Sequence, residues 1–182
     1  TIRARRAVVS ALEPKQTFLQ FVGREHLSED FVDKVEGYSF GRISICRVHL
    51  ALSEAPQFTN GADMSACLFH RIVDSSEQMT RFYAELSMGV PPSDPFLWCA
   101  CWTLLDPSRA PPGNHTLILD TFVSNWLADG RRWQDYGPEY VEQVLLPKLR
   151  QYAPNITNDK ILGRYVETRE SLEAANPSFV DG

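Results

Sequence analysis

The chain has 182 residues, of which 43% are hydrophobic and 23% are charged. This composition is typical of a folded domain with an apolar core and excludes a disordered chain. The formal net charge of −5 argues against a nucleic-acid partner, because that binding needs an excess of Lys and Arg. No apolar run reaches the roughly 18 residues that a membrane-spanning helix needs, and no signal peptide is visible. We therefore expect one cytoplasmic domain over residues 1–182.

The first forty residues predict a short strand followed by two helices. Residues 2–10 contain adjacent valines, which favour a strand. Pro14 suits the first turn of a helix, and Gly23 can end that helix. Ser28 is an N-cap candidate for the second helix, which Gly37 can stop.

Residues 43–52 predict a strand with two different faces. Apolar side chains alternate with Arg47 and His49, which is the period of a half-buried strand. Further strands are predicted over residues 64–72, 96–103, 116–123 and 160–166.

Two more helices are expected between these strands. Ser75 and Gln78 form a capping-box pattern at the start of the first, before Gly89. A long amphipathic helix runs from 133 to 152, and Pro147 should kink or split it. The fold class that follows is α+β: a mostly antiparallel sheet of about four to five strands, covered on one side by helices.

Few residues point to chemistry by themselves. The chain has no GxGxxG loop, so it has no dinucleotide-phosphate site of its own. His49 and His70 lie on predicted strands, where a structural histidine is expected more often than a catalytic one. Acids such as Glu142, Asp159 and Glu167 fall on polar faces or in turns and are interpreted as solvated. The cysteines are expected to be buried free thiols, and no metal site is predicted: Cys46, Cys67, Cys99 and Cys101.

An aromatic stripe is the strongest candidate for a binding surface. Phe96, Trp98 and Trp102 alternate along one predicted strand. They are either core packed against the helices or the wall of an apolar-ligand cavity, and both readings stay open. The helix over 133–152 offers peripheral membrane contact as an alternative, but its basic residues form no continuous face.

Three segments carry a resemblance to a known family. They are Ala7-Val-Val-Ser10, the loop Asp106-Pro-Ser-Arg-Ala-Pro-Pro-Gly113, and residues 167–182. In this order they resemble the middle of a phytoene dehydrogenase-like FAD-dependent oxidoreductase, the family of carotenoid desaturases. The sequence departs from the family pattern after Ser10, where Ala11 to Glu13 replace the usual Asn, Ala and Asp, and at Arg169, which replaces a proline.

The resemblance implies a substrate-binding domain that lies between the two FAD-binding parts of a longer parent chain. It implies FAD in the parent, no tightly bound FAD in this fragment, and an apolar, isoprenoid-like or carotenoid-like substrate. By position in the motif, Ser10 would lie near the flavin, and Phe96, Trp98 and Trp102 would line the substrate pocket. No catalytic residue is assigned. The isolated fragment, which starts without Met, is expected to be inactive.

Two alternatives remain open. The chain is a non-catalytic module without flavin that binds an apolar ligand or a protein, or it is an unrelated α+β domain for an apolar ligand.

Overall fold

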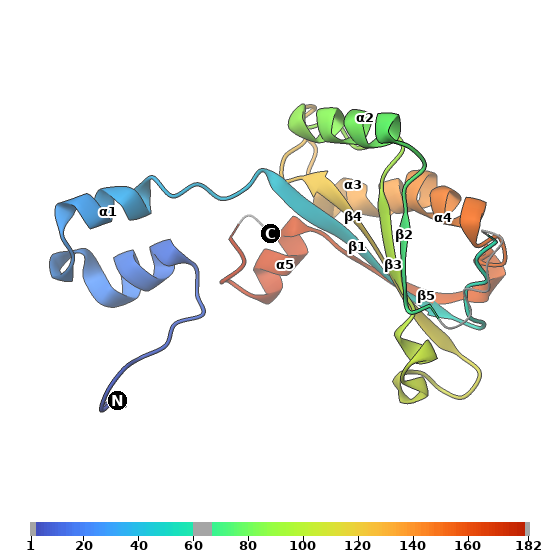
Figure 1. The fold of residues 1–182 in the computed structure, drawn as a ribbon, viewed down its shortest axis with the longest axis horizontal. Helices are drawn as coiled ribbons and strands as arrows, with labels where there is room; N and C mark the ends of the chain where they lie inside the picture. The colour runs from blue at the N-terminus through green and yellow to red at the C-terminus, as the bar shows by residue number, and fades with distance from the viewer. Residues whose placement is uncertain (1–2, 60–66, 181–182) are drawn as a thin grey trace.

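The computed structural model describes residues 3–59 and 67–180. Within them, five antiparallel strands form one sheet in the order β2-β3-β4-β1-β5 (Figure 1). The bounds are β1 Ile43–Leu52, β2 Phe69–Ile72, β3 Leu97–Ala100, β4 His115–Ser124 and β5 Ile161–Glu167. Helices cover this sheet, so the predicted α+β class with four to five strands is confirmed.

Strand β1 has the predicted pair of faces. Cys46, Val48 and Leu50 are at most 2% exposed, whereas Arg47 and His49 remain partly exposed. The buried face packs against three consecutive helical segments: α3 Trp133–Tyr140, η5 Val141–Leu145 and α4 Leu146–Tyr152. One apolar core therefore lies between this face and these helices.

The predicted long helix is interrupted, as Pro147 suggested. The five residues Val141–Leu145 form a wider, π-helical segment, and Pro147 lies in the first turn of α4. A proline is tolerated there because its missing N–H would have no partner within the new helix.

Helix α2, Ser76–Ser87, covers one end of the second sheet face. Its Phe82 lies 6.4 Å from Phe96, and Phe96 lies 6.2 Å from Phe122, between ring centroids. Ser75 caps this helix as expected, accepting a hydrogen bond from the Gln78 N–H at 3.0 Å. The Gln78 side chain, however, accepts from the N–H of Asp74 rather than from that of Ser75.

The N-terminal arm, residues 3–36, holds the two predicted helices away from the sheet (Figure 1). These are the π-helical η1, Lys15–Gly23, followed by the short η2, Arg24–His26, and then α1, Glu29–Glu36. The strand predicted over residues 2–10 is wrong for the described part, which has no strand partner. Val8 and Val9 are 84% and 92% exposed. Their β-branched side chains favour extended backbone, but a strand also needs a neighbour.

Two other predicted strands differ in length. The strand expected over 96–103 ends at Ala100, and Trp102 belongs to the 3₁₀ segment η3, Trp102–Leu104. Part of the strand expected over 64–72 lies outside the described residues, and β2 itself begins at Phe69. The short helix α5, Arg169–Ala175, follows β5 and packs beside α3.

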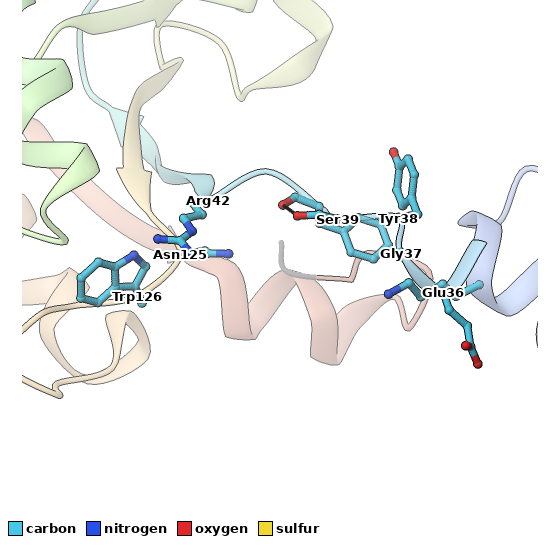
Figure 2. A pocket seen from close by; sticks show the side chains of 9 residues that line it. Glu36, Gly37, Tyr38, Ser39, Arg42, Asn125 and Trp126 are labelled. Atoms are coloured by element: carbon cyan, nitrogen blue, oxygen red, sulfur yellow. Dashed lines mark hydrogen bonds between the residues drawn. The ribbon is translucent and has the colours of Figure 1, made fainter. Parts of the chain in front are cut away.

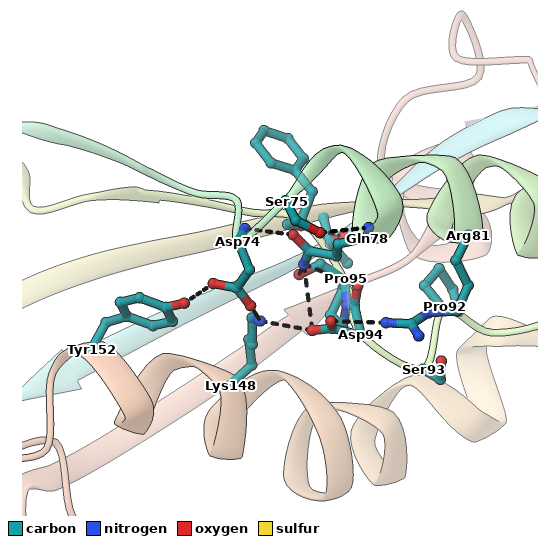
Figure 3. A network of polar contacts seen from close by, with 12 residues as sticks. Asp74, Ser75, Gln78, Arg81, Pro92, Ser93, Asp94, Pro95, Lys148 and Tyr152 are labelled. Atoms are coloured by element: carbon teal, nitrogen blue, oxygen red, sulfur yellow. Dashed lines mark hydrogen bonds and ion pairs between the residues drawn. The ribbon is translucent and has the colours of Figure 1, made fainter.

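A polar network fastens α2 to the helices behind the sheet (Figure 3). The Lys148 ammonium, 6% exposed, contacts Asp74 and donates to Asp94 at 2.7 Å. Tyr152 donates to the same Asp74. Burial alone would lower the pKa of Lys148, but its hydrogen bonds to the two carboxylates raise the pKa above its ordinary value. Lys148 therefore stays protonated at neutral pH.

We expect Lys148→Met to lower the free energy of unfolding by about 1–3 kcal/mol, because two carboxylates lose their cation in a partly buried place. Lys34→Met is the matched control, since Lys34 pairs with Asp30 on an exposed helix face. Lys34→Met should lower the free energy of unfolding by at most about 0.5 kcal/mol. Urea unfolding of both variants measures this, and equal losses would contradict the role given to Lys148.

Three cysteines, Cys46, Cys99 and Cys101, are buried, and Cys67 is only partly buried. Burial, assisted by the negative charge of Asp120, raises the pKa of Cys46 and that of Cys99 to about 12. Because the thiolate is the reactive form, iodoacetamide should label Cys67 in the native chain and reach Cys46 and Cys99 only after unfolding. Mass spectrometry with and without urea tests this, and fast native labelling of Cys46 would contradict it.

Candidate functional site

Beyond the end that α2 covers, the second face of the sheet is exposed. Phe69, Trp98 and Tyr165 retain 45%, 36% and 57% of their accessible surface. The pairing registers align one residue from each strand in a single row across this face. In strand order the row is Arg71, Trp98, Asp120, Arg47 and Glu167.

Ion pairs join the middle of this row. Arg47 donates from Nε and Nη2 to the two Asp120 oxygens at 2.8 and 2.9 Å. Its Nη1 lies 3.9 Å from Glu167, which also binds His49 Nε2 at 3.0 Å. The hydrogen bonds to Asp120 raise the pKa of Arg47. These charged groups hold one another in place, so Asp120, Arg47 and Glu167 form a fixed ionic row on the sheet face.

Glu167 differs from its sequence interpretation. The sequence predicts a solvated carboxylate, but the side chain is only 23% exposed and contacts His49 and Arg47. The residues responsible lie about 120 positions earlier in the chain, in β1. The alternation of Arg47 and His49 was the available signal, although it does not name their partner.

The structure brings together two of the three predicted pocket aromatics. Trp98 and Trp102 both lie near Phe69, with ring centroids 6.3 and 5.2 Å away. Phe96 instead packs between Phe82 and Phe122, beneath α2. Of the two readings of the stripe, the packing of the partly buried Phe96 between two aromatic rings fits core, and the exposure of Trp98 fits a surface that can meet a ligand.

A hollow of about 570 Å³ lies beside these aromatics. Its floor is a row of small residues from three adjacent strands, Thr116, Ala51 and Gly163. A Cβ built on Gly163 would meet no atom within 4 Å. Larger side chains stand around the floor: His49, Ile118, Tyr165, Trp102 and Arg109. The hollow exists because three strands carry small residues at matching positions.

Two other hollows of similar size are less suited to a ligand. One of about 680 Å³ lies between the connection 37–42 and the turn after β4, and Figure 2 shows Tyr38 and Glu36 far from Trp126. Another, of about 730 Å³, is lined only by residues 8–22 of the N-terminal arm. Neither brings side chains from several strands together.

The two strand histidines have different surroundings. His70 is 7% exposed, stacks on Phe58 at 3.7 Å, and donates from Nε2 to the Cys67 carbonyl. Burial lowers the pKa of His70, which keeps the ring neutral near pH 7. It is a satisfied structural histidine. His49 lies at the hollow and pairs with Glu167, so it is the histidine available to a ligand.

Ser10 lies on the N-terminal arm rather than on the sheet. Its hydroxyl hydrogen-bonds the Thr17 hydroxyl at 2.7 Å and accepts from the Leu12 N–H at 3.3 Å. These contacts shape the turn into η1. The glycines with positive φ in the described residues are spread over four separate turns: Gly23, Gly89, Gly113 and Gly130. These residues do not fit a flavin-phosphate cradle, which clusters glycines between a strand and a helix.

Comparison with known proteins gives a distant relationship. No protein-family model matches the chain. It is 23% identical over 177 residues to pyridine nucleotide-disulfide oxidoreductase domain-containing protein 2 of Mus musculus and to that of Rattus norvegicus. The match covers 92% of this chain and 30% of each relative. The likeness relates the chain to an oxidoreductase-domain protein and does not single out the phytoene dehydrogenase-like family.

No helix within residues 3–59 and 67–180 combines the length and the apolar character needed to cross a membrane. In the same part of the chain, no three His, Cys, Asp or Glu side chains are grouped as metal ligands.

Proposed function

We propose that the chain is the substrate-binding domain of an FAD-dependent oxidoreductase, a desaturase or dehydrogenase that acts on a largely apolar substrate. The observation that carries the proposal is the exposed sheet face, where Trp102 and Tyr165 line a hollow and Trp98 lies on the same face, beside the ionic row. Large aromatic surfaces and few polar groups are typical of substrate sites. The distant oxidoreductase relatives support the same reaction class.

In this proposal the flavin is held by other parts of a longer protein. The chain's own residues do not fit a flavin-phosphate site, and the chain matches 30% of its relatives' length. The N-terminal arm also exposes Val8, Val9 and Phe21, at 84%, 92% and 71%. Exposed apolar groups of this kind are typical of an interface. We propose that they contact the flavin-binding domain, and that the sheet orients the substrate and excludes water.

A flavin measurement tests the reaction class. The full product of the gene should show the visible absorption bands of flavin after purification, and the 182-residue chain alone should show none, because it lacks a phosphate cradle. Denaturation of the full product should release FAD, identified by chromatography. A full product without flavin would contradict the proposal and favour the non-catalytic apolar-ligand module.

Trp98→Ala tests whether the exposed face binds substrate. Because Trp98 is 36% exposed, its loss should lower the free energy of unfolding by only about 1 kcal/mol while weakening substrate binding in the full enzyme about tenfold. Phe82→Ala is the contrasting control, since Phe82, on the buried face of α2, is 0% exposed. Phe82→Ala should lower the free energy of unfolding by about 3–5 kcal/mol. Unchanged substrate affinity in Trp98→Ala would contradict the assignment.

A further inference from the structure

The charged side chains that line the hollow have one sign. They are Arg109 and Arg164, while the ionic row of the sheet carries its own balanced charges. Among the described residues, no Asp or Glu lines the hollow. A ligand there meets an apolar floor and cationic groups at the rim. Charge complementarity therefore favours a ligand with an anionic end.

Arg109 is the cation best placed to meet such a ligand. It lies in η4, Pro107–Arg109, in the connection between β3 and β4 at the bottom of Figure 1. Its guanidinium carbon stands 5.6 Å from the Trp102 ring centroid. Its ion pair with Asp106, at 3.4 Å, is about half exposed on both sides. A pair in that setting is weak, so a ligand carboxylate can replace it at little cost.

Arg164 contributes less to the inside of the hollow. Its guanidinium pairs with Glu142 of η5. His49 is held through Nε2 by Glu167, which leaves Nδ1 for a ligand. Arg109 is thus the cation that the hollow offers a ligand, and His49 is a further polar group at the hollow, 3.0 Å from Glu167.

We propose that this hollow binds the carboxylate of a small molecule with an apolar chain or ring, the carboxylate at Arg109 and the apolar body over Ala51, Thr116 and Gly163. The proposal deepens the proposed function and rests on it only for the ligand's role as substrate. The binding itself belongs to the 182-residue chain and is measured without flavin.

The probe is cis-parinaric acid, a conjugated fatty acid that fluoresces in apolar surroundings, used below its micelle-forming concentration. Oleate should displace it about tenfold more effectively than methyl oleate, because only the acid makes a charge-assisted hydrogen bond. Arg109→Gln should remove this preference and leave methyl oleate unchanged. Arg131→Gln is the matched control, because Arg131 pairs with Asp129 and lies over the Tyr136 ring outside the hollow.

Gly163→Phe tests the position of the apolar body. The new ring has open space in front of it and fills the hollow, so binding of both oleate and its ester should fall at least tenfold. Gly41→Phe is the control, since that glycine also has open space and lies away from the hollow. Circular dichroism verifies that both variants fold.

The outcomes are decisive. Equal displacement by oleate and methyl oleate, an unchanged preference in Arg109→Gln, or full binding in Gly163→Phe would each overturn the assignment. A full gene product that carries flavin while its 182-residue part shows no carboxylate preference would leave the proposed function standing and remove only this site. A full gene product without flavin, together with a carboxylate preference in the 182-residue chain, would support the site and contradict the oxidoreductase role.

Discussion

The pairing of β1 with β4 over ten residues determines which side chains lie on each sheet face. A shift of one residue would turn Cys46, Val48 and Leu50 outward and place Arg47 against the helices. The cost of burying that charge, together with the loss of the apolar core, makes the observed register strongly preferred. The other edge of β1 pairs with β5, and the register of that pair places Glu167 opposite Arg47.

This constraint explains how a charged face and a binding surface coexist. Arg47 is held by two carboxylates, and Asp120 is only 13% exposed, so the ionic row is fixed before any ligand arrives. A preorganised surface beside a binding site loses little conformational entropy on binding. The hollow lies two rows away, where the same three strands carry Thr116, Ala51 and Gly163. The strand registers therefore align both the residues of the ionic row and the small residues beneath the hollow.

The sequence predicted β1 with its true ends because alternation and burial agree there, and it predicted the helix split because Pro147 acts locally. It failed where a partner decides the structure. Val8 and Val9 have strand propensity without a neighbouring strand, and Trp102 continues an alternating pattern after pairing has stopped at Ala100. The bond between His49 and Glu167 spans 118 residues, and no local pattern encodes it.

The candidate site follows the same division between local and long-range information. An aromatic stripe is visible in the sequence, but only the fold separates Phe96, which packs against Phe82 of α2, from Trp98 on the exposed part of the face. The hollow depends on three small residues from β1, β4 and β5, each unremarkable alone. Its polarity depends on Arg109, which a rigid proline-containing turn brings beside Trp102. The ionic row has balanced charges and its partners are fixed, whereas Arg109 can exchange its exposed partner Asp106 for a ligand. A ligand with one anionic end therefore has one favoured orientation in the hollow.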